Sequence, residues 1–89
     1  MANPSVKTIT AGQWIKVATN VTSGVVNILD DTPNKYYQTY RDTGGGAPAN
    51  GNLSEAIPFD KQFIISAGAG IDVYVACSGD VNGSVRVDL

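Results

Sequence analysis

The sequence predicts an all-β fold: a small single-domain β-sandwich or barrel of about seven antiparallel strands with one long Gly/Pro-rich loop. Three observations support this prediction. Val, Ile, Thr and Tyr, which favour strands, are frequent, whereas the helix-favouring Leu, Glu, Lys and Met are scarce. Several short segments alternate apolar and polar side chains, and turn residues separate them. At 89 residues, the chain is expected to form one domain over residues 1–89.

Four strands are expected in the first half of the chain. Residues 6–10 (VKTIT) alternate, and residues 13–19 (QWIKVAT) follow, with VTSG predicted to turn the chain. Residues 25–29 (VVNIL) form the third strand, which DDTPN ends because Asp, Pro and Asn favour turns. Residues 35–41 (KYYQTYR) form the fourth, and alternation divides their tyrosines between its two faces.

Three more strands are expected in the second half. Residues 61–67 (KQFIISA) are predicted to turn at GAG into residues 71–77 (IDVYVAC). Residues 84–89 (SVRVDL) form the last strand. The strict alternation of the last two segments indicates sheets that have one face in water.

One long loop and one terminal arm complete the predicted domain. Residues 42–60 lack periodicity and contain three consecutive glycines, two prolines and two asparagines. Loops of this length in a small domain are usually functional or mobile. Within it, NLSEA is expected to make one helical turn capped by Asn52 or Ser54. Residues 1–5 (MANPS) are expected to form a flexible arm that orders on binding.

The segment SGDVNGS lies between the last two predicted strands. Asp80 and Asn82 have the spacing of calcium ligands, but the glycine and the final Glu of an EF-hand loop are not at the required positions. Asn82-Gly83 is a favoured pair in a tight hairpin turn. We therefore predict a β-hairpin here, with calcium binding as the alternative.

Composition argues against several classes of function. Six basic residues are scattered against eight acidic ones, so no basic patch for nucleic acid is expected. The chain lacks histidine, has one cysteine and has no long apolar run or signal sequence at its start. We expect no disulfide, no membrane segment, and synthesis in a cytoplasm. In so short a chain, oligomerisation is the remaining means of extra stability.

The sequence predicts no catalytic, cofactor-binding or metal-binding site. Cys77 lies on an apolar strand face, and a buried thiol is expected. Trp14 is expected in the core. Asp30, Asp31 and Asp42 leave a cation site open as an alternative to exposed turn carboxylates. TGGG lacks the lysine of a phosphate-binding P-loop, and glycine flexibility explains it better.

A tyrosine cluster beside the long loop is the best candidate for a contact surface. Tyrosine and arginine are favoured at protein interfaces, and tyrosine also stacks on sugars. The alternative is that Tyr36 and Tyr40 only cover one face of a sheet. The candidate interface residues are Tyr36, Tyr37, Tyr40, Arg41, Thr43, Gly44, Gly45, Gly46, Asn50, Asn52 and Leu53.

Nearly the whole chain resembles small virion-associated structural proteins of tailed bacteriophages. The resemblance rests on ITAGQWIKVATNVTSGVVNI, then TPNKYYQTYR, a Gly/Pro/Ala-rich loop, and FIISAGAGIDVYVACSGDVNGSVRVDL. It implies a non-enzymatic structural role in the virion, foremost capsid decoration or, as an alternative, a neck or tail accessory. The implied partners are other virion proteins and further copies of the chain, without nucleic acid, membrane or cofactor. A small carbohydrate- or receptor-binding module that uses the same tyrosines is the alternative from another class.

Overall fold

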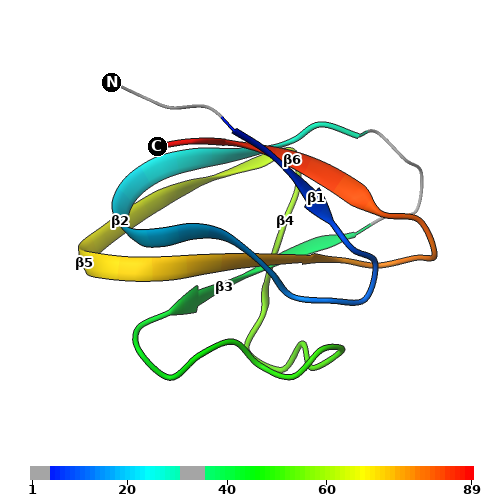
Figure 1. Cartoon of the computed structure of the whole chain (residues 1–89), viewed down its shortest axis with the longest axis horizontal. Coiled ribbons are helices and arrows are strands. Elements are labelled where there is room, and N and C mark those ends of the chain that lie inside the picture. The colour runs from blue at the N-terminus through cyan, green and yellow to red at the C-terminus, as the bar shows by residue number, and fades with distance from the viewer. Residues whose placement is uncertain (1–4, 31–35) are drawn as a thin grey trace.

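The computed structural model describes residues 5–30 and 36–89 of the chain. Its strands are β1 (Ser5–Ile9), β2 (Ile15–Ile28), β3 (Tyr37–Asp42), β4 (Ile57–Phe59), β5 (Gln62–Cys77) and β6 (Gly83–Asp88). Neighbouring strands are antiparallel, and the order across the single sheet is β1-β6-β2-β5-β3-β4 (Figure 1). The predicted all-β class is confirmed, and the described part of the chain contains no helix that could cross a membrane.

The strand count differs from the prediction because two expected turns are not turns. The chain continues as strand through VTSG in β2 and through GAG in β5. Each of these strands therefore replaces two predicted ones. One strand was missed: β4 lies inside the predicted loop 42–60 and pairs with β3. The seven-stranded arrangement is thus replaced by six described strands, and the edge strands β1 and β4 do not pair to close a barrel.

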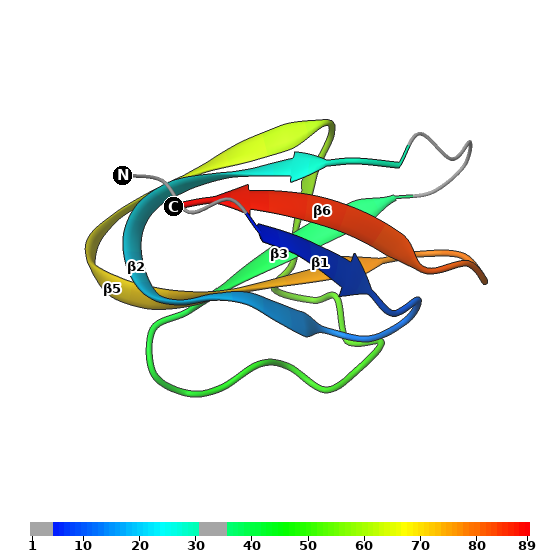
Figure 2. The same cartoon turned by 45° about the horizontal axis from the view of Figure 1, so that its top comes forward.

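β2 and β5 bend together, as Figures 1 and 2 show at the left of each view. The register between them is irregular here, because residues 67–70 of β5 stand opposite Thr22 alone. Extra residues on one strand bend a sheet and increase its twist. Asn20 adopts a left-handed conformation at φ 52°, and a Cβ at Gly70 would lie 2.9 Å from its side-chain Cγ. The residues that suggested turns therefore make the bend of a two-stranded ribbon.

The predicted terminal hairpin is wrong. β5 and β6 are not paired; β6 lies between β1 and β2, and residues 78–82 cross from one part of the sheet to another. Neither Asn82 nor Gly83 has a positive φ. The Asn82 side-chain oxygen accepts a hydrogen bond from the Ala11 amide at 3.0 Å, which ties this crossing to the turn after β1. Gly83 is needed for space, since a Cβ there would lie 2.8 Å from Cζ of Tyr37.

The core lies inside the bent sheet and is built by alternation. Val73 and Val75 of β5 and Val85 and Val87 of β6 are fully buried. Burying each such side chain stabilises the fold by about 1.5–3 kcal/mol relative to exposure. Cys77 is buried as predicted, and its Sγ contacts the Ile9 carbonyl oxygen at 3.6 Å. A buried thiol in this position packs as a small apolar group.

Candidate interaction site

The alternation of β3 separates its aromatic side chains as predicted. Tyr37 and Thr39 point into the core, where they are 4% and 2% exposed. Tyr36 is 65% exposed, Tyr40 is half-buried, and Arg41 is exposed. The three candidate tyrosines therefore have three different environments, and only Tyr36 presents most of its ring to solvent.

Tyr37 is an interior residue that shapes the surface next to it. Its ring lies 6.0 Å from that of Phe59, and its hydroxyl donates a hydrogen bond to Asp30. Burial, helped by this bond to a carboxylate, raises the pKa of Tyr37 well above its ordinary value. Asp30 also accepts from the Ser84 amide at 3.2 Å. Tyr37 was predicted as an interface residue, but it is buried, and its ring forms a fixed part of the surface beside it.

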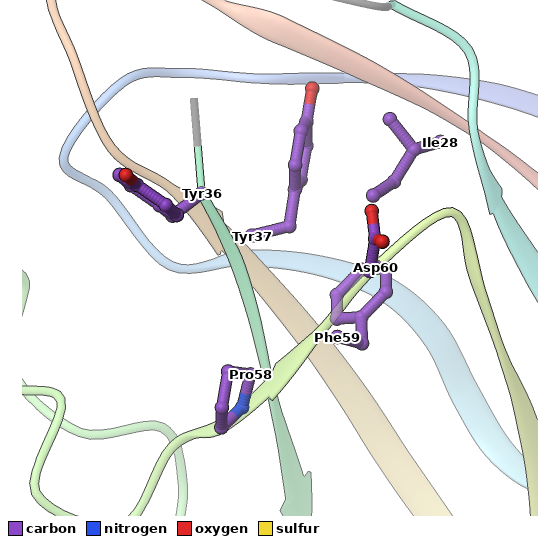
Figure 3. A pocket seen from close by; sticks show the side chains of 6 residues that line it. All are labelled: Ile28, Tyr36, Tyr37, Pro58, Phe59 and Asp60. Atoms are coloured by element: carbon purple, nitrogen blue, oxygen red, sulfur yellow. The ribbon is translucent and has the colours of Figure 1, made fainter. Parts of the chain in front are cut away.

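Tyr37 borders a pocket of about 490 Å³. Its volume is in the range of ligand-binding clefts. Figure 3 shows Tyr36 on one side of Tyr37 and Asp60 with Ile28 on the other. We call this the β3–β4 pocket; the residues that line it are Ile28, Tyr36, Tyr37, Pro58, Phe59 and Asp60.

A tight turn holds Asp60 at the pocket. Lys61 adopts a left-handed conformation at φ 67°, which is uncommon for a residue other than glycine. Two short hydrogen bonds fix this turn: the Lys61 carbonyl accepts from the Ile28 amide at 2.7 Å, and the Asp60 carbonyl accepts from the Gln62 amide at 2.7 Å. The carboxylate of Asp60 is therefore carried by an ordered backbone.

The chain around the pocket exposes apolar side chains. Leu29, which follows Ile28, is 49% exposed, and Ile57, which precedes Pro58, is 52% exposed. Both are sequence neighbours of residues that line the pocket, and Tyr36, which is itself exposed, lines it. Exposed apolar groups of this kind favour a contact surface.

The sequence analysis missed most of this site. Pro58, Phe59 and Asp60 were assigned to an aperiodic loop, and Ile28 to an ordinary strand. The signal that was present is IPFD, an apolar and aromatic run just before a predicted strand. The pocket itself depends on β4 pairing with β3, which local sequence does not reveal.

Tyr40 and the long loop form a second structure on the outer face of the sheet. Trp14, buried as predicted, meets Tyr40 edge-on with ring centroids 6.2 Å apart. The Trp14 backbone amide donates to Oδ1 of Asn50 at 3.0 Å, and its indole Nε1 donates to the Asn52 carbonyl at 3.2 Å. The predicted contact residues Asn50 and Asn52 thus hold the loop to the domain, while Leu53 remains 46% exposed.

The predicted helical turn in this loop is a single turn. The Ala56 amide donates to the Leu53 carbonyl at 3.1 Å. The Asn52 side chain accepts from the amide and the hydroxyl of Ser54, at 3.1 and 2.9 Å. Asn52 therefore caps this turn, but no helix follows in the described chain.

The glycine run at residues 44–46 wraps around a carboxylate. Oδ1 of Asp42 accepts from the Gly44 amide at 2.8 Å and from the Gly46 amide at 3.0 Å. The Gly44 amide, followed by those of Gly46 and Gly45, holds the pKa of Asp42 below its ordinary 3.8. These amides are satisfied by Asp42, and Gly46 needs its positive φ of 89° to make the wrap.

The aspartates considered for a cation site have separate roles. Asp30 contacts Tyr37 and Ser84, Asp42 holds the glycine run, and Asp31 lies outside the described residues. Residues 5–30 and 36–89 contain no group of three or more His, Cys, Asp or Glu side chains arranged to hold a metal. Of the predicted N-terminal arm, residues 1–4 also lie outside the described chain, and Ser5 begins β1.

Comparison with known proteins leaves this site to be interpreted from its own chemistry. No protein-family model, no curated protein and no solved structure matches the chain. The resemblance to virion proteins therefore stays a prediction, and the β3–β4 pocket is the feature from which a function is argued.

Proposed function

We propose that this chain is a non-enzymatic structural protein of a bacteriophage virion that decorates the capsid through protein–protein contacts. The alternative within this proposal is an accessory protein that binds at the neck or tail of the particle instead of the capsid. The sequence resemblance supports a role in the virion, and the β3–β4 pocket supports the location of the contact surface.

The observation that carries the proposal is the β3–β4 pocket, which is lined by apolar and aromatic side chains and by the exposed Tyr36. Protein interfaces are built around a few aromatic and apolar side chains that fill or line a pocket. Tyr36 is the aromatic side chain with the greatest exposure in the described chain, and it stands at this pocket. A partner that covers it removes a large apolar area from water.

The sheet edges favour contacts through side chains over the addition of a strand. β1 is short and carries the exposed Lys7, and β4 has only three residues with Pro58 at its centre. Edge lysines and prolines are the devices by which sheets resist edge-to-edge pairing. We propose that the bent sheet acts as a small two-layer sandwich whose β3–β4 end meets the partner, and that further copies of the chain bind alongside.

The proposal is tested on virions purified from the phage that encodes the chain. Mass spectrometry should detect the chain in amounts comparable to the major capsid protein, and its absence from intact virions would refute the proposal. Recombinant protein is then added to particles stripped of the chain. Tyr36→Ala should rebind more weakly, whereas Ile64→Ala, which truncates a side chain of similar exposure elsewhere on the sheet, should rebind normally.

A carbohydrate-binding module is the second candidate. Tyr36 and Asp60 line the same pocket, which pairs an aromatic ring with a carboxylate. Against it, a platform of three tyrosines does not form, because Tyr37 is buried and Tyr40 packs edge-on against Trp14. Selective retention of the wild-type chain on a glycan array, lost in Tyr36→Ala, would favour this second candidate.

A further inference from the structure

The β3–β4 pocket combines an apolar lining with one carboxylate. Among the lining residues that belong to the described ranges 5–30 and 36–89, Asp60 is the only charged side chain, and none is basic. Within the described chain, the Asp60 side chain makes no hydrogen bond or ion pair; its backbone carbonyl alone is engaged, by Gln62. A carboxylate held by an ordered turn beside aromatic rings is a site that attracts a cation.

We propose that the β3–β4 pocket binds an arginine side chain of a partner protein, with Asp60 as its counter-ion. The inference rests on the proposed function, since it names the chemistry that the partner must present to the same site. We propose a cationic partner because of charge complementarity: the described lining of the pocket carries one negative charge, and the whole chain has a net charge of −2.

The lining selects arginine by its shape as well as its charge. The guanidinium is planar, stacks on aromatic faces and pairs with carboxylates through two parallel hydrogen bonds. Its aliphatic stem covers apolar surface while the charged head stays hydrated. Pro58 and Phe59 offer apolar contact for the stem, and Figure 3 shows the Asp60 carboxylate beyond Phe59, toward Ile28. Tyr36, on the other side of Tyr37, remains free to contact the partner's neighbouring residues.

The test is a titration of the full-length, isotope-labelled chain with N-acetyl-L-arginine methylamide, followed by NMR. Signals of Ile28, Tyr36 and Phe59 should shift in a saturable manner. The citrulline analogue, which is neutral and nearly the same shape, should bind about three- to fivefold more weakly, as expected for an exposed ion pair at the upper end of its range. Added salt should reduce the difference between the two ligands.

Matched variants locate the charge. Asp60→Asn should remove the preference for arginine over citrulline, whereas Asp80→Asn, the same change at an exposed aspartate in the 78–82 crossing, should leave it intact. Both positions are exposed, so both variants should fold, and their melting curves check this. Equal binding of arginine and citrulline by the wild-type chain, or an unchanged preference in Asp60→Asn, would overturn the proposal.

Three further outcomes distinguish the arginine site from the proposed virion role. If light scattering shows that the wild-type chain self-associates and that Asp60→Asn does not, the pocket is occupied by a second copy of the chain. The proposal that it binds a different protein is then wrong. If the titration fails but the chain is present on virions, only the arginine site is lost. If the titration succeeds and the chain is absent from virions, the arginine site stands and the proposed virion role falls.

Discussion

Replacing Gly83 with alanine should destabilise the fold, because the ring of Tyr37 occupies the space of the new side chain. A Cβ at Gly83 would lie 2.8 Å from Cζ and 3.1 Å from Cε2 of Tyr37, with the hydroxyl closer still. Carbon atoms in ordinary contact are about 3.5–4.0 Å apart. Tyr37 is buried and bound to Asp30, so it cannot simply turn aside.

The magnitude follows from two opposing effects. Overpacking of this kind costs about 1–3 kcal/mol in the free energy of unfolding. Alanine also restricts the unfolded chain more than glycine does, which raises the free energy of unfolding by about 0.4–1 kcal/mol. The difference between the two is about 0–2.6 kcal/mol. Because the clash is with a buried ring that is hydrogen-bonded to Asp30, we expect the upper part of this range, about 1–2 kcal/mol, which for a domain of this size lowers Tm by about 4–16 °C.

A double-mutant cycle with Tyr37→Phe tests the cause. Phenylalanine removes the hydroxyl, which is the atom nearest to the new Cβ. By itself, Tyr37→Phe should cost about 1.5–3 kcal/mol, because it breaks a hydrogen bond to a carboxylate. In that background, the cost of Gly83→Ala should fall by at least about 0.5 kcal/mol. Urea unfolding followed by Trp14 fluorescence and by circular dichroism gives the four free energies.

Gly68→Ala is the matched control. A Cβ at Gly68 has no atom within 4 Å, and its φ is not positive, so its free energy of unfolding should stay within about 0.5 kcal/mol of the wild type. The reasoning is refuted if Gly83→Ala is as stable as Gly68→Ala, or if its cost is the same with tyrosine and with phenylalanine at position 37.

Two further predictions concern the long loop. The pKa of Asp42 is lowered in the folded chain, so its contribution to stability is present above the unfolded pKa of about 3.9 and is lost as pH falls through the lower folded pKa. Unfolding free energies measured from about pH 7 to about pH 2 should therefore converge for the wild type and Asp42→Asn at the acid end; parallel curves would contradict this. Trp14→Phe should lose about 0.5–1.5 kcal/mol with its indole hydrogen bond to Asn52, and hydrogen exchange should quicken at Ala56. Unchanged exchange there would show that the indole does not anchor the loop.

Local patterns in the sequence predicted most of the strand-forming segments and the faces of their side chains, although not the strand count or β4. In β3, alternation placed Tyr37 and Thr39 on one face and Tyr36 and Tyr40 on the other, as the structure has them. The burial of Cys77 and of the valines of β5 follows the same rule. These features were predictable because side chains on a strand alternate between its faces whatever the partner strand is.

Turn residues were less informative, because they mark any departure from regular pairing. VTSG and GAG bend a continuous ribbon instead of ending strands, and Asn82-Gly83 serves a side-chain hydrogen bond and a close approach to Tyr37. Turn residues that end a strand and turn residues that bend one have the same composition. Which of the two occurs depends on pairing with strands that lie far away along the chain.

The sequence by itself determined the class of this protein: β-strands, one wet face, and a core of alternating apolar residues. Only the tertiary structure decided which strands are neighbours, and with that the candidate site. The β3–β4 pocket takes Ile28 from the end of β2 and Asp60 from the turn before β5, while Tyr36 and Pro58 meet there because β4 pairs with β3. Alternation is a property of each strand, whereas pairing depends on the whole chain, so the pocket could not be foreseen from the residues that line it.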